Sequence, residues 1–333
     1  MQQVGFGSTG MRVSALGLGT MSFGKAADRD ASAALYARAR DAGITFFDCA
    51  DVYADGASEQ ILGALIADHR DEVVISTKAY FPTGDAPNAR GGSRYHLERA
   101  VDASLRRLGT DRIDVYYLHR FDDDTPLEET LRGMERLVAT GKVLYPAVSN
   151  FSAWQTAKAM GIQARHGWAP MTGIQPMYNL VKRTAEIELL PMARAEGLAV
   201  TPYSPLGGGL LSGRYGADRR PDSGRIVDND MYAERYGAPW VFDVAERFTA
   251  LANERGVHPV TLAVAWVGHH PAVTCPLVGA RDVQQLEPAL AAADFEMDDA
   301  LYAEIAALSP APPPATDRNE EGSGSDYATV LRR

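Results

Sequence analysis

The chain has 333 residues, of which 46% are hydrophobic, enough for one large domain or two modest ones. Its formal net charge of −10 argues against nucleic acid as a partner, because phosphate backbones require a basic protein surface. The chain has no apolar run long enough to span a membrane and no signal-peptide pattern at its start, so we expect a soluble, cytoplasmic protein without a membrane partner.

Eight short runs rich in β-branched and aromatic residues predict strands. They cover residues 15–19, 44–47, 73–77, 113–118, 143–148, 172–175, 199–203 and 273–278. Helical patterns lie between them. Residues 28–42 open with acids, residues 93–108 follow a serine cap and stop before a glycine, and a third helix runs from Thr125-Pro126 to near Gly141.

This alternation predicts an α/β fold, an eight-stranded parallel (β/α)8 TIM barrel spanning residues 1–308 as a single domain. An open, doubly wound sheet is the alternative. Gly17-Leu18-Gly19 argues against it, because the third glycine that would open a helix is missing. A long loop, residues 207–240, follows the seventh strand, and loops of this length typically form lids or binding loops.

Residues 309–333 form a tail with four prolines and then a polar stretch, for which disorder is the default expectation. The alternative is that Tyr327, Val330 and Leu331 dock this tail onto the barrel.

Four polar residues follow β-rich runs or lie a few residues beyond them: Asp48, Tyr53, Lys78 and His119. In a parallel barrel such strand ends share one face, so these side chains are expected to converge. We expect the Lys78 ammonium, paired with Asp48, to lower the pKa of the Tyr53 phenol. Tyr53 would then protonate a carbonyl oxygen to which His119 donates a hydrogen bond. Each residue alone is usually structural; their joint occurrence indicates a catalytic tetrad.

Other chemistries have weaker support. His269 and His270 are adjacent rather than spaced as metal ligands, and no C-x-x-C or H-x-x-x-H pattern occurs, so no metal is expected. Cys49 and Cys275 lie in apolar runs and are expected to be buried free thiols, as in a reducing compartment. A nucleophile-elbow motif is absent. An aldolase that uses Lys78 as a Schiff-base nucleophile stays an alternative.

A hydride donor must be a bound cofactor, since no side chain supplies hydride. Residues 203–215 after the seventh strand contain three consecutive glycines that let backbone amides approach a diphosphate, or that merely form a flexible connection. Arg214 and Arg281, in the loops after strands seven and eight, favour a phosphate-rich ligand and NADPH over NADH.

Over residues 5–308 the chain resembles the aldo-keto reductases, and within them the bacterial branch that is similar to potassium-channel β subunits. The resemblance implies the barrel fold and NADPH bound without a Rossmann domain. Channel members of this branch lack a histidine at the position of His119, so the histidine here favours an enzyme. The resemblance also implies a set of cofactor-binding residues. These are Gly19, Thr20, Met21, Asp48, Ser149, Asn150, Gln175, Tyr203, Ser204, Pro205, Leu206, Gly208, Gly209, Leu210, Arg214, Gly279, Arg281 and Gln285.

Two positions depart from the family pattern. Pro288 and Ala289 stand where Glu-Asn commonly holds the adenine, so that contact would fall to Gln285. Pro146-Ala147 replaces an aliphatic residue and glycine in the fifth strand.

We therefore predict an NADPH-dependent aldo-keto reductase that transfers hydride between nicotinamide and an aldehyde or ketone, with Tyr53 as proton donor. The alternative is a non-catalytic NADP(H)-binding redox sensor or regulatory subunit. The partner is a small-molecule carbonyl substrate, and the sequence leaves the oligomeric state open. Aromatic residues near the strand ends and in the long loop are candidate walls of the substrate pocket: Phe23, Tyr80, Phe81, Phe121, Tyr232, Tyr236 and Trp240.

Overall fold

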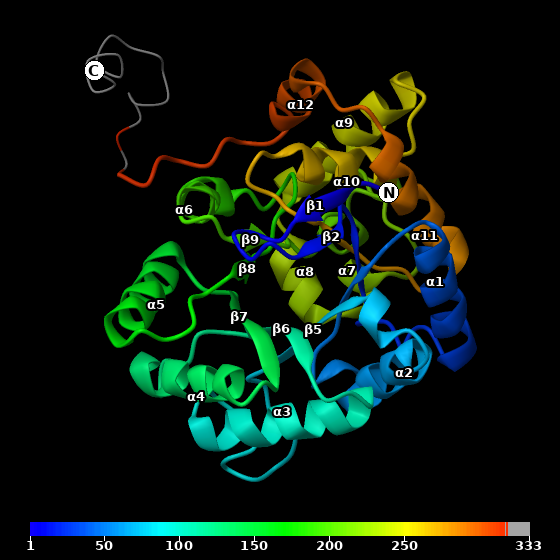
Figure 1. The fold of residues 1–333 in the computed structure, drawn as a ribbon. Helices are drawn as coiled ribbons and strands as arrows, with labels where there is room; N and C mark the ends of the chain where they lie inside the picture. Colours follow the sequence, from blue (N-terminus) through cyan, green and yellow to red (C-terminus); the bar gives the residue numbers. More distant parts are fainter. Residues whose placement is uncertain (317, 319–333) are drawn as a thin grey trace.

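The computed structural model describes residues 1–316 and 318. Eight parallel strands form one sheet in the middle of the molecule, and helices surround it (Figure 1). Along the chain they are β3 (Gly17–Gly19), β4 (Phe46–Asp48), β5 (Val74–Ala79), β6 (Ile113–Leu118), β7 (Val143–Ser149), β8 (Gly173–Gln175), β9 (Ala199–Val200) and β10 (Leu277–Val278). Neighbours in the sheet follow the chain from β3 to β9, and β10 pairs with β3.

Backbone hydrogen bonds between the seventh and eighth strands close this sheet into a barrel. The amides of Thr274 and Cys275 donate to the Val200 carbonyl at 2.9 and 3.2 Å, and the Leu277 amide donates to the Pro202 carbonyl at 2.9 Å. The predicted (β/α)8 TIM-barrel fold is confirmed.

Observed and predicted strand boundaries differ mainly in four strands. Strands β9 and β10 are shorter than expected because Pro202 and Pro276 have no N–H to donate to a ladder. Strands β4 and β5 extend further than expected, so Asp48 and Lys78 lie within the ends of strands rather than after them.

A two-stranded hairpin that was not predicted, β1 (Gln3–Gly5) and β2 (Arg12–Ser14), precedes the barrel. In Figure 1 it lies across the middle of the ring of strands. The chain around it places Phe6 and Val13, both fully buried, in a cluster with Phe46 and Tyr117. The hairpin therefore plugs the amino-terminal end of the barrel, where these rings fill the interior.

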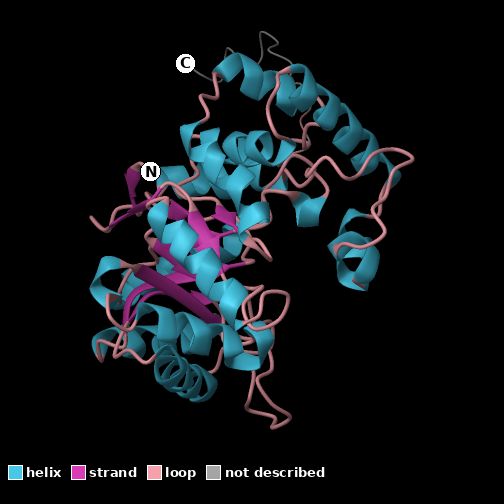
Figure 2. Ribbon diagram, turned by 90° about the vertical axis from the view of Figure 1, so that its right-hand side faces the viewer, coloured by secondary structure: helices cyan, strands magenta, loops and turns pink. Residues whose placement is uncertain are grey.

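The helices pack outside the strands, as Figure 2 shows from the side. In the described part of the chain they are α1 (Arg29–Asp41), α2 (Ala57–Ile66), α3 (Arg94–Leu108), α4 (Leu127–Ala139), α5 (Ala153–His166), α6 (Leu189–Ala195), α7 (Arg225–Asp228), α8 (Asp230–Tyr236), α9 (Pro239–Glu254), α10 (Pro259–His269), α11 (Val283–Leu290) and α12 (Asp299–Ala306).

Local sequence explains where several helices begin. The side chains of Asp28, Ser93 and Ser152 accept hydrogen bonds from the first-turn amides of α1, α3 and α5, as N-cap residues do. Ser152 and Gln155 form a reciprocal capping box at the start of α5.

The long segment after the seventh strand is more ordered than predicted. It contains α7, α8 and the start of α9, and it is anchored by buried tyrosines. The hydroxyl of Tyr236 accepts from the Asn179 side chain at 3.2 Å, and a Cβ on Gly208 would meet the Tyr232 ring at 2.8 Å. Helix α8 therefore packs directly against Gly208, at the start of the same segment.

The proposed docking residues Tyr327, Val330 and Leu331 lie outside the described residues. Within residues 1–316 and 318, every helix is too short or too polar to cross a membrane.

Candidate active site

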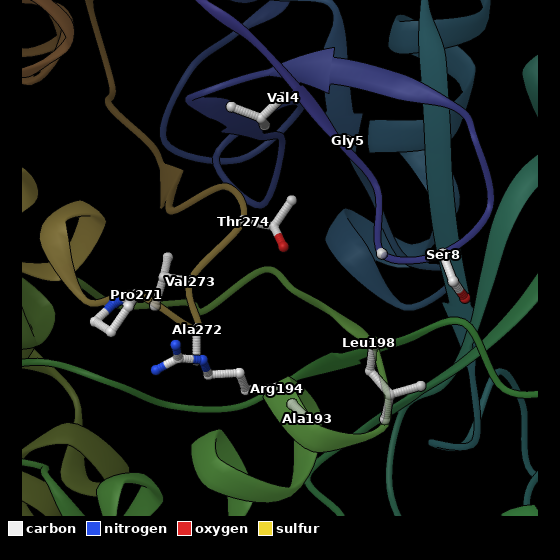
Figure 3. A pocket seen from close by; sticks show the side chains of 12 residues that line it. Val4, Gly5, Ser8, Ala193, Arg194, Leu198, Pro271, Ala272, Val273 and Thr274 are labelled. Carbon is white, nitrogen blue, oxygen red and sulfur yellow. The ribbon is translucent and has the colours of Figure 1, made fainter.

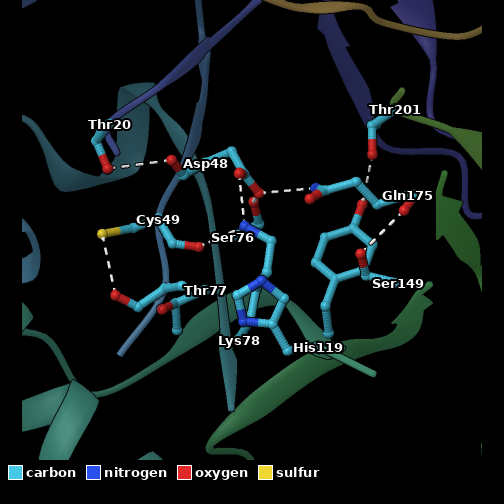
Figure 4. Close-up of polar contacts among 12 residues, drawn as sticks. Thr20, Asp48, Cys49, Ser76, Thr77, Lys78, His119, Ser149, Gln175 and Thr201 are labelled. Carbon is cyan, nitrogen blue, oxygen red and sulfur yellow. Dashed lines mark hydrogen bonds and ion pairs between the residues drawn. The ribbon is translucent and has the colours of Figure 1, made fainter. Parts of the chain in front are cut away.

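A buried ion pair lies at the carboxyl ends of β4 and β5. The Lys78 Nζ atom donates to Asp48 Oδ2 at 2.6 Å and to the Cys49 carbonyl at 2.6 Å (Figure 4). The side chains of Lys78 and Asp48 are 0% and 4% exposed. The expectation that Asp48 supplies the counter-charge of Lys78 is confirmed.

Two neighbouring strands hold the other oxygen of Asp48. Ser76 Oγ on β5 donates to Asp48 Oδ1 at 2.6 Å, and Gln175 Nε2 on β8 donates to the same atom at 2.9 Å. Gln175 was predicted from the family resemblance as a cofactor contact; here its amide nitrogen is committed to Asp48. Ser76 was not predicted. Its signal in the sequence is its place two residues before Lys78, because alternate strand residues point to the same side of a sheet.

Tyr53 begins a tight turn just beyond β4. The turn spans Tyr53–Gly56 and holds Ala54 and Asp55 at φ of 49° and 52°, a conformation that non-glycine residues seldom adopt and that marks a strained segment. The Lys78 Nζ atom lies 5.2 Å from the centroid of the Tyr53 ring. The sequence-predicted phenol and ammonium therefore lie together at one end of the barrel.

The expected effect of Lys78 on Tyr53 was wrong. Burial raises the pKa of Tyr53 well above its ordinary value, and the neighbouring Asp48 carboxylate adds to the increase. The positive charge of Lys78 is balanced by Asp48 at 2.6 Å, so the pair presents little net charge to the phenol. Tyr53 is consequently protonated at neutral pH.

His119 completes the group from the loop after β6. Its ring meets the rings of Tyr53 and Phe81 edge-to-face, with centroids 6.1 and 4.9 Å apart. Burial, with a smaller effect of the Lys78 charge, lowers the pKa of His119 to about 3. The imidazole is therefore neutral, and among the described residues its Nδ1 atom has no hydrogen-bond partner.

Three predicted cofactor residues form a connected wall beside this group. The Tyr203 hydroxyl donates to Asn150 Oδ1 at 2.7 Å, and Asn150 Nδ2 donates to the His119 carbonyl at 2.9 Å and to Ser149 Oγ at 3.1 Å. Asn150 has a φ of 55°. Asn150 is exposed and Tyr203 is partly exposed, so the wall is open to a ligand.

The glycine loop after β9 has an uncommon backbone conformation. Ser204, Gly207, Gly208 and Gly209 all have positive φ, and nothing lies within 4 Å of a Cβ built on Gly209. The amides of Gly207 and Gly209 donate to the carbonyls of Ser204 and Leu206 at 2.9 and 3.1 Å, so the loop is a series of tight turns with open space beside Gly209. Pro205 and Leu210 are buried beneath it, Leu206 is partly buried, and Arg214 is exposed at its end.

The loop after β10 lies beside the end of β3. A Cβ on Gly279 would lie 3.4 Å from the Gly19 carbonyl oxygen, and the exposed Arg281 contacts Gln285. Met21 is 36% exposed. Thr20 is buried, and its hydroxyl donates to the Asp48 carbonyl at 3.1 Å, so Thr20 holds a strand end.

The long segment contributes Arg225, which was not predicted for the site, and Tyr232, which was. The charge of Arg225 lowers the pKa of Tyr53, in opposition to the dominant effect of burial, and the hydroxyl of Tyr232 raises it. Phe23 and Tyr236 were expected to line the substrate pocket, but both are fully buried and belong to the core. The remaining aromatic candidates are Tyr80, Phe81, Phe121, Tyr232 and Trp240.

A cavity at the opposite end of the barrel is a poor alternative site. It has a volume of about 440 Å³ and is lined by residues that precede β9 and β10, among them Arg194, Leu198 and Thr274 (Figure 3). It contains no member of the tetrad. In (β/α)8 barrels catalytic chemistry belongs to the carboxyl ends of the strands.

Comparison with known proteins agrees with this geometry. The model of the Aldo/keto reductase family matches residues 15–310. The uncharacterized oxidoreductase YrpG of Bacillus subtilis is 36% identical over 94% of this chain and 97% of its own length. A probable voltage-gated potassium channel subunit beta of Oryza sativa is 36% identical, covering 88% and 92%, and an Escherichia coli L-glyceraldehyde 3-phosphate reductase is 34% identical, covering 84% of both chains.

A closed barrel with a buried carboxylate–ammonium pair at its carboxyl end, matched by these comparisons, is an oxidoreductase acting on carbonyl or alcohol groups. The chain belongs to the aldo/keto reductase family. Members of this family use nicotinamide cofactors.

Proposed function

We propose that the chain is an NADPH-dependent reductase of aldehydes or ketones in which Tyr53 is the proton donor. The observation that carries the proposal is the grouping of a protonated phenol, a buried ion pair and a neutral imidazole: the Lys78 ammonium lies 5.2 Å from the Tyr53 ring, and the His119 ring 6.1 Å from it.

In this proposal each residue has a separate task. A nicotinamide cofactor, when bound, would supply the hydride that forms the new C–H bond. Tyr53 gives its proton to the carbonyl oxygen, forming the O–H bond and leaving a phenolate. The Lys78 ammonium, which lies 5.2 Å from the centroid of the ring, helps to position Tyr53, and neutral His119 donates a hydrogen bond to the same carbonyl oxygen.

The residues that would hold the cofactor fall into three groups. Ser149, Asn150 and Tyr203 would contact the nicotinamide, and the glycine loop with Arg214 would bind the diphosphate. Arg281 and Gln285 would bind the adenosine end, where exposed guanidinium groups favour the additional phosphate of NADPH over NADH. Pro288 lies inside α11 and its carbonyl accepts from Thr261, so it has no donor for an adenine.

The test is NADPH oxidation followed by absorbance with a panel of aromatic and aliphatic aldehydes. We expect Tyr53→Phe to lower kcat by about 10²–10⁴, the range of general acid catalysis, with little change in NADPH affinity. Tyr95→Phe, at a 58% exposed tyrosine, is the matched control. Undiminished turnover in Tyr53→Phe would remove Tyr53 from this role.

A second function is a non-catalytic NADP(H)-binding sensor or regulatory subunit, favoured by the channel β-subunit names of two relatives. Tight NADPH binding with turnover below about one event per minute would support it, because typical enzymes turn over at ~10 per second.

The domain division at 308/309 and a cytoplasmic location also remain proposals. The family model ends at residue 310, close to the proposed boundary.

A further inference from the structure

Three consecutive residues hold the turn after Tyr53 in a left-handed conformation. Ala54, Asp55 and Gly56 have φ values of 49°, 52° and 89°. Residues other than glycine seldom adopt this conformation, and they keep it only where surrounding contacts enforce it. Because Tyr53 is the first residue of the same turn, the contacts that hold the turn also set the position of the Tyr53 ring.

The side chain of Arg107, in the last turn of α3, lies directly on this turn. A Cβ on Gly56 would meet Arg107 Cδ at 2.8 Å and Arg107 Nε at 3.0 Å, both closer than ordinary van der Waals contact. The glycine therefore leaves the space that the arginine occupies. The stem of Arg107 packs against the backbone of the turn and limits its movement toward α3.

Glu59 of α2 fixes the Arg107 side chain. Glu59 is fully buried, and its Oε2 atom accepts from Arg107 Nε at 2.7 Å. Its other oxygen, Oε1, accepts from Thr77 Oγ1 at 2.6 Å. Arg107 Nη2 also donates to Ser104 Oγ at 3.3 Å. A buried carboxylate that lost the guanidinium would keep one hydrogen bond from a neutral hydroxyl, so we expect Glu59 and Arg107 to be strongly coupled.

Thr77 joins this ion pair to β5. It precedes Lys78, and neighbouring residues of a strand point to opposite faces of the sheet. Thr77 therefore contacts Glu59 on the side that faces α2, whereas Lys78 points into the barrel. The backbone adds a second link, because the Asp51 amide, two residues before Tyr53, donates to the Lys78 carbonyl at 3.1 Å. One connected set of contacts thus reaches both Lys78 and Tyr53.

We propose that Arg107, held by Glu59, is a positioning residue that fixes the turn carrying Tyr53 and so sets the reach of the phenol to the substrate oxygen. The inference rests on the proposed function, in which Tyr53 is the proton donor. Arg107 makes no hydrogen bond to the four tetrad residues in the described part of the chain, so it acts through the turn. A displacement of about 1 Å at a reacting group can lower a rate by about 10²-fold.

The test compares Arg107→Met with Arg70→Met in the full-length protein. Arg70 is a matched control, because it is 13% exposed and pairs with Asp114 at 2.9 Å, but lies at the opposite, amino-terminal ends of β5 and β6. Both substitutions should lower the urea midpoint, since each removes a guanidinium from a buried carboxylate. Only Arg107→Met should lower kcat, by about 10–100-fold, with the Kd for NADPH within about twofold of the wild-type value.

Two milder variants keep the test decisive if Arg107→Met does not fold. Arg107→Lys retains a charge that can pair with Glu59, so its kcat should lie between those of the wild type and Arg107→Met. Glu59→Gln keeps the size of the side chain but weakens the hydrogen bond to Arg107, so it should lower kcat in the same direction and by less. Wild-type kcat in both variants would contradict the proposal.

A second measurement does not require turnover. In cofactor-free protein labelled with ¹³C in its tyrosine rings, the NMR signal of Tyr53 is identified by its absence in Tyr53→Phe. This signal should shift in Arg107→Met and stay at the wild-type position in Arg70→Met. If the wild type reduces no carbonyl compound, the proposed function fails, while the Tyr53 signal still reports whether Arg107 positions the ring.

Three outcomes would overturn the proposal. They are an unchanged kcat in a folded Arg107→Met variant, an equal loss of kcat in Arg70→Met, and a Tyr53 signal that Arg107→Met leaves at the wild-type position.

Discussion

The Asp48–Lys78 pair allows a quantitative test of what holds the candidate site together. Removing one partner of a buried ion pair typically costs about 3–5 kcal/mol, because the remaining charge stays in a place with little water. The two single substitutions leave the remaining partner with different numbers of hydrogen bonds. After Lys78→Met, the Asp48 carboxylate keeps its hydrogen bonds from Ser76 and Gln175. After Asp48→Asn, the Lys78 ammonium keeps the Cys49 carbonyl.

We therefore expect Asp48→Asn to destabilise the protein by about 5 kcal/mol and Lys78→Met by about 3 kcal/mol. The double variant should lose far less than the sum, because it buries two neutral side chains and the introduced amide can still pair with Ser76. Urea denaturation of the cofactor-free protein, followed by circular dichroism, gives the free energies of unfolding. If the single effects add to the double effect within about 0.5 kcal/mol, the pair is not coupled and the reasoning fails.

Three further predictions concern α2, α5 and His119. A Cβ on Gly63 of α2 would lie 2.5 Å from the Leu108 carbonyl oxygen, so Gly63→Ala should destabilise the protein by about 1–3 kcal/mol. Nothing lies within 4 Å of a Cβ on Gly161 of α5, so Gly161→Ala should stabilise the protein by up to ~1 kcal/mol. Equal urea midpoints for the two variants would contradict this prediction. Ser152→Ala removes the capping box of α5 and should cost about 1 kcal/mol in the same assay, while an unchanged midpoint would argue against the cap. Burial lowers the pKa of His119 to about 3, below the value of about 6.5 for histidine in the unfolded chain. The contribution of neutral His119 to stability is therefore present above pH 6.5 and is lost as the pH falls from about 6.5 toward 3. The NMR signal of the His119 ring should not titrate between about pH 8 and 5, and a titration midpoint near ~6.5 would refute the burial argument.

The barrel was predictable because its strands leave a local pattern. Strand β6 is buried at all six positions, and its run of β-branched and aromatic residues gave the observed boundaries. The hairpin β1–β2 was not predictable, since three-residue strands carry too little periodicity and are stabilised by contacts such as that of Phe6 with Phe46. The predicted boundaries of β9 and β10 were too long, because Pro202 and Pro276 are compatible with an extended backbone but cannot donate a hydrogen bond to a neighbouring strand.

The candidate site was predictable in its membership but not in its electrostatics. Asp48, Tyr53, Lys78 and His119 come together because parallel strands end at one face. The pKa of Tyr53 depends on burial and on how completely Asp48 balances Lys78, and neither can be read from residue order. The sequence likewise gives no sign that Arg225, more than a hundred residues along the chain, acts on Tyr53.

The barrel has one weak joint. Strands β9 and β10 have two residues each, and their edges are joined by a few hydrogen bonds from backbone amides to the carbonyls of Val200 and Pro202. The glycine loop and the Gly279–Arg281 loop hang from the two sides of that joint. A molecule bound by both loops would link β9 to β10. It should slow hydrogen exchange of the amides between these two strands and raise the melting temperature as its concentration increases.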